Sequence, residues 1–114
     1  MAKEHGDLLQ GTLGLIILKA LAAEELHGFG IARWIERVSG DILRIEEGSL
    51  YPALRRLEDR GLITSRWAIS DNNRRARYYS LTRAGTQHLR GEASTWLKFA
   101  GAVTTVLRAE PAMA

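Results

Sequence analysis

A chain of 114 residues with a formal charge of +3 has room for one domain with a single hydrophobic core, and little surplus. It contains no cysteine, which excludes disulfides, thiolate catalysis and cysteine-ligated metal sites and fits a reducing cytoplasm. Its longest apolar run, from Leu13 to Leu18, is far shorter than the ~20 residues of a membrane span, and no signal-peptide segment precedes Leu8. We therefore expect a cytoplasmic protein without a transmembrane helix.

An apolar stretch near the N-terminus predicts a first helix that begins between Asp7 and Thr12 and ends at about Ala23. Asp7 and Gln10 have the spacing of a capping box, and Thr12 offers an alternative start. A helix that is apolar on most sides is buried between two layers, and in a short chain another subunit can supply the second layer. The apolar residues are Leu9, Leu13, Leu15, Ile16, Ile17, Leu18, Ala20 and Leu21.

A second helix is predicted from apolar residues at i, i+3, i+4 and i+7, and Gly40 ends it. His27 lies at its start, where a capping or packing role is favoured over a ligand or acid/base role, because no second histidine or carboxylate has a useful spacing. The segment from Asp41 to Ile45 is a connector and a candidate edge strand for a small sheet. The apolar positions of the helix are Ile31, Trp34, Ile35 and Val38.

A third helix has an apolar face made by Leu50, Ala53, Leu54 and Leu57. Ser49 is predicted to cap its start and Gly61 to end it, which makes Pro52 the third helical residue, where a missing N–H costs little. The opposite face is polar and can enter a major groove, although an isolated Arg-Arg pair is better explained as a solvated helix face. Its residues are Ser49, Tyr51, Arg55, Arg56 and Asp59.

A β-hairpin follows the third helix and changes that interpretation. Residues 62–69 alternate with a period of two, which predicts a half-buried strand with Ile63, Ser65, Trp67 and Ile69 on one face, and RARYYSL begins its partner. The intervening SDNNRR contains turn formers, so we expect the loop near residues 71–73. A hairpin beside a basic helix is typical of the wing of a winged helix-turn-helix, in which the second and third helices form the helix-turn-helix unit.

The predicted hairpin tip carries side chains that can bind nucleic acid. Arg74 and Arg75 supply donors for phosphates and minor-groove edges. Asn72 and Asn73 are assigned chiefly to the turn, and Asn73 also belongs to the predicted DNA-binding set.

Positive charge is concentrated in this half of the chain. Between Arg55 and Arg90 there are nine arginines and three acidic residues, a balance of +6 against +3 for the whole chain. A focused positive face indicates a phosphate-binding partner, whereas evenly spread charge would indicate only solubility.

A last helix is predicted from a Thr82 cap to about Arg108. Apolar residues recur at intervals of 4, 3, 4, 3 and 4, the spacing of a coiled-coil seam, with Leu97, Phe99 and Val106 outside it. Only the first helix offers a partner within the chain, so we expect this helix to form a dimer. The seam consists of Leu89, Ala93, Trp96, Ala100, Val103 and Leu107.

The three tryptophans receive different predictions. Trp34 and Trp67 are expected in the core. For Trp96 core packing is slightly favoured over a second interpretation, in which it lines a cavity between subunits and binds a ligand. The predicted organisation is a winged helix-turn-helix DNA-binding domain over residues 1–81, a dimerisation helix over 82–108 and a tail over 109–114.

Four segments closely resemble the PadR family of bacterial transcriptional regulators: LLQGTLGLIILKAL, LHGFGIARWI, EEGSLYPALRRLEDRGLI and NNRRARYYSLTRAG. The likeness covers residues 8 to 90 in the expected order and spacing. It implies a homodimeric winged helix-turn-helix protein, usually a repressor. Some PadR-like proteins bind flat aromatic effectors between subunits. The resemblance therefore supports the ligand-binding interpretation of Trp96, although core packing stays slightly favoured.

Three functions could account for a chain with these features. A dimeric DNA-binding repressor acting on a pseudo-palindromic operator explains the basic helix, the wing and the apolar last helix together. A winged module for protein contact would show no salt-sensitive binding to duplex DNA, and an RNA-binding domain would need an aromatic stacking platform that the sequence lacks. Neither an enzyme nor a cofactor is expected, because no nucleophile, phosphate-loop or metal motif occurs and His5, His27 and His88 are dispersed.

Overall fold

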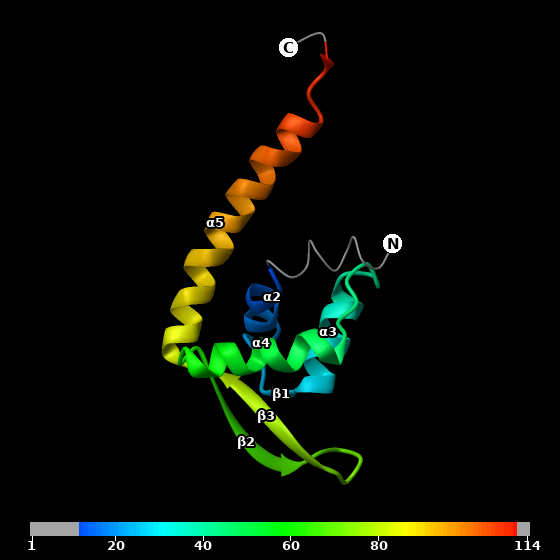
Figure 1. The fold of residues 1–114 in the computed structure, drawn as a ribbon, viewed down its shortest axis with the longest axis vertical. Helices are drawn as coiled ribbons and strands as arrows, with labels where there is room; N and C mark the ends of the chain where they lie inside the picture. Colours follow the sequence, from blue (N-terminus) through cyan, green and yellow to red (C-terminus); the bar gives the residue numbers. More distant parts are fainter. Residues whose placement is uncertain (1–11, 112–114) are drawn as a thin grey trace.

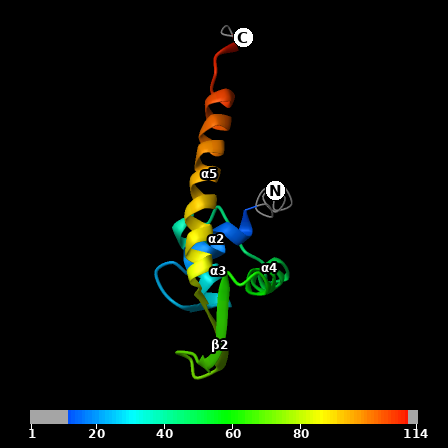
Figure 2. The ribbon, with the colours of Figure 1, turned by 90° about the vertical axis from the view of Figure 1, so that its left-hand side faces the viewer.

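The computed structural model describes residues 12–111, which form four helices and a three-stranded antiparallel sheet (Figure 1). The predicted class, mainly α with a small hairpin wing, is confirmed. Three helices and the base of the sheet make a compact unit, and the last helix projects away from it (Figures 1 and 2). In chain order the elements are α2 (Leu13–Ala20), β1 (Leu26–His27), α3 (Gly28–Val38), α4 (Glu47–Asp59), β2 (Ile63–Ile69), β3 (Arg75–Leu81) and α5 (Arg83–Leu107).

Helix α2 is the centre of the core, as its apolar circumference predicts. It packs against α3, α4 and α5, and Ile17 and Leu18 on it are almost completely buried. The helix ends at Ala20, three residues earlier than predicted, because the chain must turn before Leu26 can join the sheet. The predicted start near Asp7 lies outside the described residues.

Helix α3 begins and ends as the sequence predicts. The Nδ1 atom of His27 accepts a hydrogen bond from the Gly30 N–H at 2.9 Å, which confirms a capping role. Gly40 follows the helix with a φ of 62°, and Trp34 packs against the core. Val38, predicted on the buried face, is 62% exposed because the last helical turn extends beyond the core.

Helix α4 begins earlier than predicted. Its N-cap is Glu46, whose carbonyl accepts from the backbone N–H groups of Ser49 and Leu50 at 3.0 and 2.9 Å. The prediction that Ser49 caps the helix is therefore wrong, and Pro52 lies inside the helix as its sixth residue rather than its third. Gly61 ends the helical segment with a φ of 75°, as expected.

The third strand of the sheet, which pairs with the hairpin, is β1, and the prediction of an edge strand within residues 41–45 is wrong. The order is β1-β3-β2, with Leu26 opposite Tyr79 and His27 opposite Tyr78. The connector instead closes the end of α3, since the Leu43 N–H donates to the Ser39 hydroxyl at 3.0 Å.

The wing has the predicted strands but not the predicted burial. Ile63 opposes Leu81 at its base and Ile69 opposes Arg75 near its tip. Only the base reaches the core, because the hairpin extends below the helices (Figure 1). Trp67, predicted to be a core residue, is therefore 55% exposed, and Ile69 is exposed as well.

Helix α5 follows the wing after a single residue. The Thr82 hydroxyl accepts from the Gly85 N–H at 3.0 Å, which confirms the predicted cap, and the helix ends at Leu107. Its first turns pack on α2, and Leu89, assigned to the seam, is buried in the chain's own core. The rest of the helix exposes large apolar side chains: Trp96, Leu97, Phe99, Val103, Val106 and Leu107. None of the helices described within residues 12–111 combines the length and the apolar composition of a membrane span.

Candidate nucleic-acid interface

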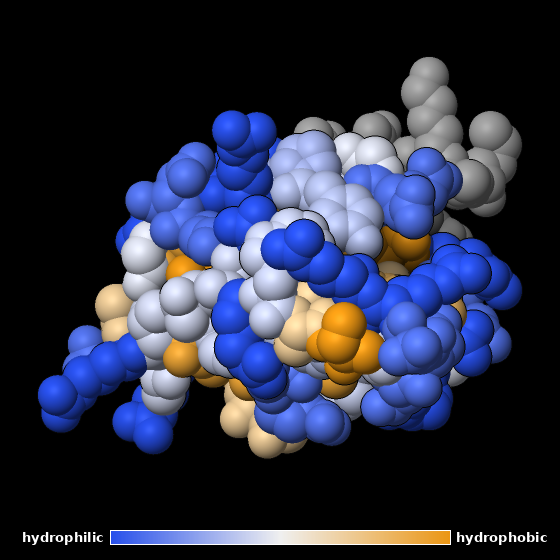
Figure 3. All heavy atoms as spheres, turned by 90° about the horizontal axis from the view of Figure 1, so that it is seen from below, coloured by the Kyte–Doolittle hydropathy of each residue, from blue (hydrophilic) through white to orange (hydrophobic). Residues whose placement is uncertain are grey.

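The candidate interface is the face of the molecule that carries the wing. Seen from below, this face is covered mainly by hydrophilic side chains around small apolar patches (Figure 3). Helix α4 contributes the side opposite its buried leucines, where all four predicted DNA-binding residues are exposed. These are Ser49, Tyr51, Arg55 and Arg56.

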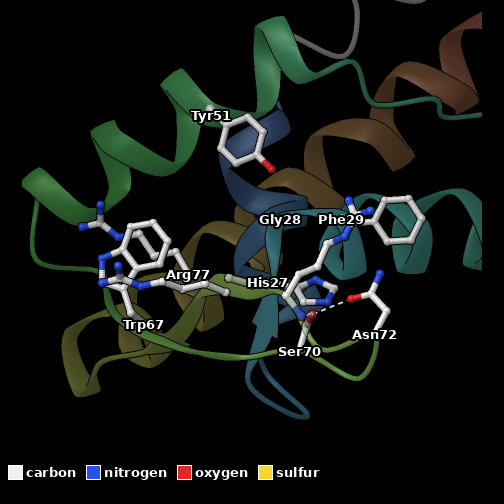
Figure 4. A pocket seen from close by; sticks show the side chains of 11 residues that line it. His27, Gly28, Phe29, Tyr51, Trp67, Ser70, Asn72 and Arg77 are labelled. Carbon is white, nitrogen blue, oxygen red and sulfur yellow. Dashed lines mark hydrogen bonds between the residues drawn. The ribbon is translucent and has the colours of Figure 1, made fainter.

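A groove separates α4 from the wing. It has a volume of about 450 Å³, and we call it the helix–wing groove (Figure 4). Tyr51 descends into it from α4, His27 and Phe29 border it at the start of α3, and the hairpin forms its other wall. Three wing arginines, Arg74, Arg75 and Arg77, line this depression, so it can bind the phosphates of a nucleic acid.

The wing tip is a turn stabilised by Ser70. The Asn73 N–H donates to the Ser70 carbonyl at 2.9 Å, and the Ser70 hydroxyl lies 2.6 Å from the Asn72 amide oxygen. Asn73 adopts a left-handed φ of 61°, which asparagine tolerates well. The turn role predicted for both asparagines is confirmed. Arg74 and Arg75 follow at the tip with exposed side chains.

Trp67 organises the arginines of the wing. The Arg75 guanidinium carbon lies 4.7 Å from the centre of the Trp67 ring, and that of Arg77 lies 5.9 Å from it. Arg77 also donates to Ser65 at 2.8 Å and lies 3.4 Å from a carboxylate oxygen of Glu58. Since Glu58 is on α4, this cluster ties α4 to the wing.

A second cluster holds the wing from its other side. The Arg66 Nε donates to Glu25 at 2.8 Å, and the Ser80 hydroxyl donates to the same carboxylate at 3.0 Å. The hydrogen bond from Arg66 lowers the pKa of the Glu25 carboxyl. Arg66 and Arg77 are thus paired within the chain, whereas Arg55, Arg56 and Arg74 form no salt bridge within residues 12–111.

Comparison with protein families agrees with this arrangement. The model of the transcriptional regulator PadR-like family matches residues 17–91, which is more than half of the chain. The chain belongs to the PadR-like family. The resemblance found in the sequence is confirmed, and the PadR-like winged fold agrees with the observed elements.

Individual PadR relatives cover the chain to different extents. The negative transcriptional regulator PadR of Bacillus subtilis is 33% identical over 78 residues, which are 68% of this chain and 43% of that protein. A PadR family regulator from Eggerthella lenta is 28% identical, with a TM-score of 0.78 over 96% of this chain and 93% of that one. The structure of Bacillus subtilis PadR in complex with operator DNA is 30% identical, with a TM-score of 0.64 over 72% of this chain and 47% of that one. This chain therefore spans less than half of each Bacillus subtilis chain.

Sequence reasoning missed several residues of this PadR-like face. The pairs that Glu25 and Glu58 form bridge segments far apart in the chain, which no local pattern reveals. The hairpin register offered one usable signal. A turn at residues 71–73 places Arg77 directly opposite Trp67, a position from which a guanidinium can reach the ring.

Proposed function

We propose that this PadR-like chain is a sequence-specific DNA-binding repressor that acts as a homodimer on a pseudo-palindromic operator. The observation that carries the proposal is the pairing of an exposed polar face on α4 with an arginine-bearing wing across one groove. In winged proteins a helix enters the major groove while the wing contacts the backbone or the minor groove. The related Bacillus subtilis PadR, whose structure is in complex with operator DNA, supports this use of the fold.

The proposed contacts follow from position on the interface. Tyr51 lines the groove between α4 and the wing, and Arg55 is exposed about one turn further along α4, so we assign both to base edges. Ser49 and Arg56 are assigned to phosphates. At the wing tip Asn73, Arg74 and Arg75 contact phosphates or minor-groove edges.

The proposed homodimer rests on the outer part of α5. Trp96 and Val103 remain 43% and 40% exposed, although both belong to a regular apolar seam. Leu89 is already buried in its own chain and Ala93 packs partly against the same core. The proposed self-association surface therefore runs mainly from Trp96 through Ala100 to Leu107. Two recognition helices held roughly 34 Å apart match half-sites one DNA turn apart.

The wing's charge provides the test of DNA binding. Arg74→Ala combined with Arg75→Ala should weaken operator binding and reduce the slope of log K against log salt by up to ~2, because two phosphate contacts are lost. The measurement is fluorescence anisotropy with duplex DNA from the chain's own promoter region, with RNA and shuffled DNA as competitors. Arg90→Ala with Lys98→Ala removes the same charge from exposed positions on α5 and serves as the control.

Each alternative gives a different result in this experiment. An unchanged salt slope in the double arginine variant would place the wing off the DNA. Preferential competition by RNA, or duplex binding that does not respond to salt, would contradict the proposed function.

We further propose that a small, flat aromatic effector binds between the subunits at Trp96. The exposed ring on the dimer surface supports this, because a planar ligand can stack on it. Such compounds should quench tryptophan fluorescence in the wild type and should lose most of that effect in Trp96→Phe. Equal quenching in both proteins would mean that Trp96 only packs.

A further inference from the structure

Tyr51 rests directly on the backbone at the start of α3. A Cβ atom added at Gly28 would lie 2.6 Å from the Tyr51 hydroxyl oxygen and 2.9 Å from Cε1 and Cζ of the ring. Cβ atoms essentially never make contacts below about 3.0 Å, so a side chain at residue 28 would force the Tyr51 ring to move. The tyrosine hydroxyl points from α4 toward this position (Figure 4).

Gly28 is not required by its own backbone. Its φ lies outside the left-handed region, where the described glycines are Gly40 and Gly61. Gly28 is the first residue of α3, directly after the His27 cap, and no positive φ requires a glycine there. The close approach of Tyr51 is the physical reason for glycine at this site.

The backbone under Tyr51 is held from two directions. His27 pairs with Tyr78 in the sheet, and the two rings lie 5.1 Å apart. The Nδ1 atom of His27 also accepts from the Gly30 N–H, which fixes the first turn of α3. Gly28 is buried between these anchors. It therefore forms a fixed floor, while the Tyr51 side chain is the movable partner.

We infer that Gly28 is a specificity-determining positioning residue, which sets the orientation in which Tyr51 meets the base edges. The inference rests on the proposed DNA-binding function. A methyl group at residue 28 would displace only the far end of a flexible, 46% exposed side chain, which the fold tolerates. The Gly28→Ala protein should therefore stay folded but hold the Tyr51 ring in a different orientation toward the DNA.

A double-mutant cycle tests the inference. Gly28→Ala and Tyr51→Ala should each lower operator affinity about tenfold or more and leave random-DNA affinity nearly unchanged, as expected when one base contact is lost. In the Tyr51→Ala background, Gly28→Ala should have no further effect. Gly14→Ala is the matched control, since its Cβ would make only an ordinary 3.6 Å contact with Leu57.

The other outcomes overturn the inference. If Gly28→Ala lowers operator affinity equally in the wild-type and Tyr51→Ala backgrounds, Gly28 acts independently of Tyr51. If Gly28→Ala leaves operator affinity unchanged, Gly28 does not position Tyr51. If Gly28→Ala unfolds, Tyr51→Ala should rescue it by removing the obstacle; an unfolded double variant contradicts the inference.

A measurement without DNA separates this inference from the proposed function. The ring NMR signals of Tyr51 should shift in free Gly28→Ala and not in Gly14→Ala. An absence of DNA binding by the wild type, with shifted Tyr51 signals, would refute the proposed function and leave only the packing of Tyr51 on Gly28. Unshifted Tyr51 signals would refute the positioning role and leave the proposed function intact.

Discussion

Replacing Val103 by glutamate is expected to yield a folded monomer whose operator affinity is lower by orders of magnitude. Val103 is 40% exposed in the single chain, so a glutamate there is solvated and leaves the chain's own core intact. In the proposed dimer the same carboxylate would be buried without a partner, which costs about 3–5 kcal/mol. Each 1.4 kcal/mol is about tenfold in the dimerisation constant, and a monomer contacts only half of the operator.

Sedimentation velocity at micromolar concentration measures this change directly. Thr105→Glu is the matched control, because Thr105 is exposed and lies on the opposite side of α5, two residues further along the chain. It should remain dimeric. A wild type that is already monomeric, or a Val103→Glu protein that still dimerises, would place the interface elsewhere.

Gly85→Ala is expected to destabilise the fold by several kcal/mol. A Cβ atom at this position would lie only 1.9 Å from the backbone carbonyl oxygen of Leu62 and 2.9 Å from its carbonyl carbon. The obstacle is backbone, and the same carbonyl accepts the Thr82 N–H at 3.1 Å, so it cannot simply move aside. The start of α5 would have to separate from the backbone of Leu62, just before β2, which exceeds the usual 1–3 kcal/mol of overpacking.

Urea denaturation of Gly85→Ala and Gly91→Ala checks this prediction. Gly91 is in the same helix, but a Cβ there meets no atom within 4 Å. Gly91→Ala should therefore be neutral or stabilise the protein by up to ~1 kcal/mol through helix propensity. Equal free energies of unfolding for the two variants would mean that the contact at Gly85 relaxes at little cost.

Periodic segments made most of the fold predictable. The apolar spacing in α3 and α4, the alternation in β2 and the Thr82 cap of α5 all have local physical causes, and each element was found. The edge strand was missed because two residues are too short to show any period. Residue type alone predicts Ser49 as the cap, but the helix begins at the backbone of Glu46 without a side-chain cap.

The candidate site was predictable in its residue types but not in its internal pairing. The exposed positions of Tyr51 and Arg55 follow from the leucine face opposite them. The exposure of Trp67 does not follow, since alternation marks two faces of a strand and cannot tell where the strand leaves the core. The contact between Tyr51 and Gly28 joins two separate helices, and only the folded chain brings them together.

The connection between the wing and α5 has a mechanical consequence. Thr82 is the single residue between β3 and α5. Its hydroxyl and N–H donate to the carbonyls of Gly61 and Leu62, which precede the opposite strand at the base of the hairpin. These two hydrogen bonds leave the start of α5 little freedom to move relative to the wing. In the proposed dimer, a small change in the crossing angle of the two α5 helices would therefore rotate both wings as well. The displacement would be largest at the wing tips, which lie farthest from the connection.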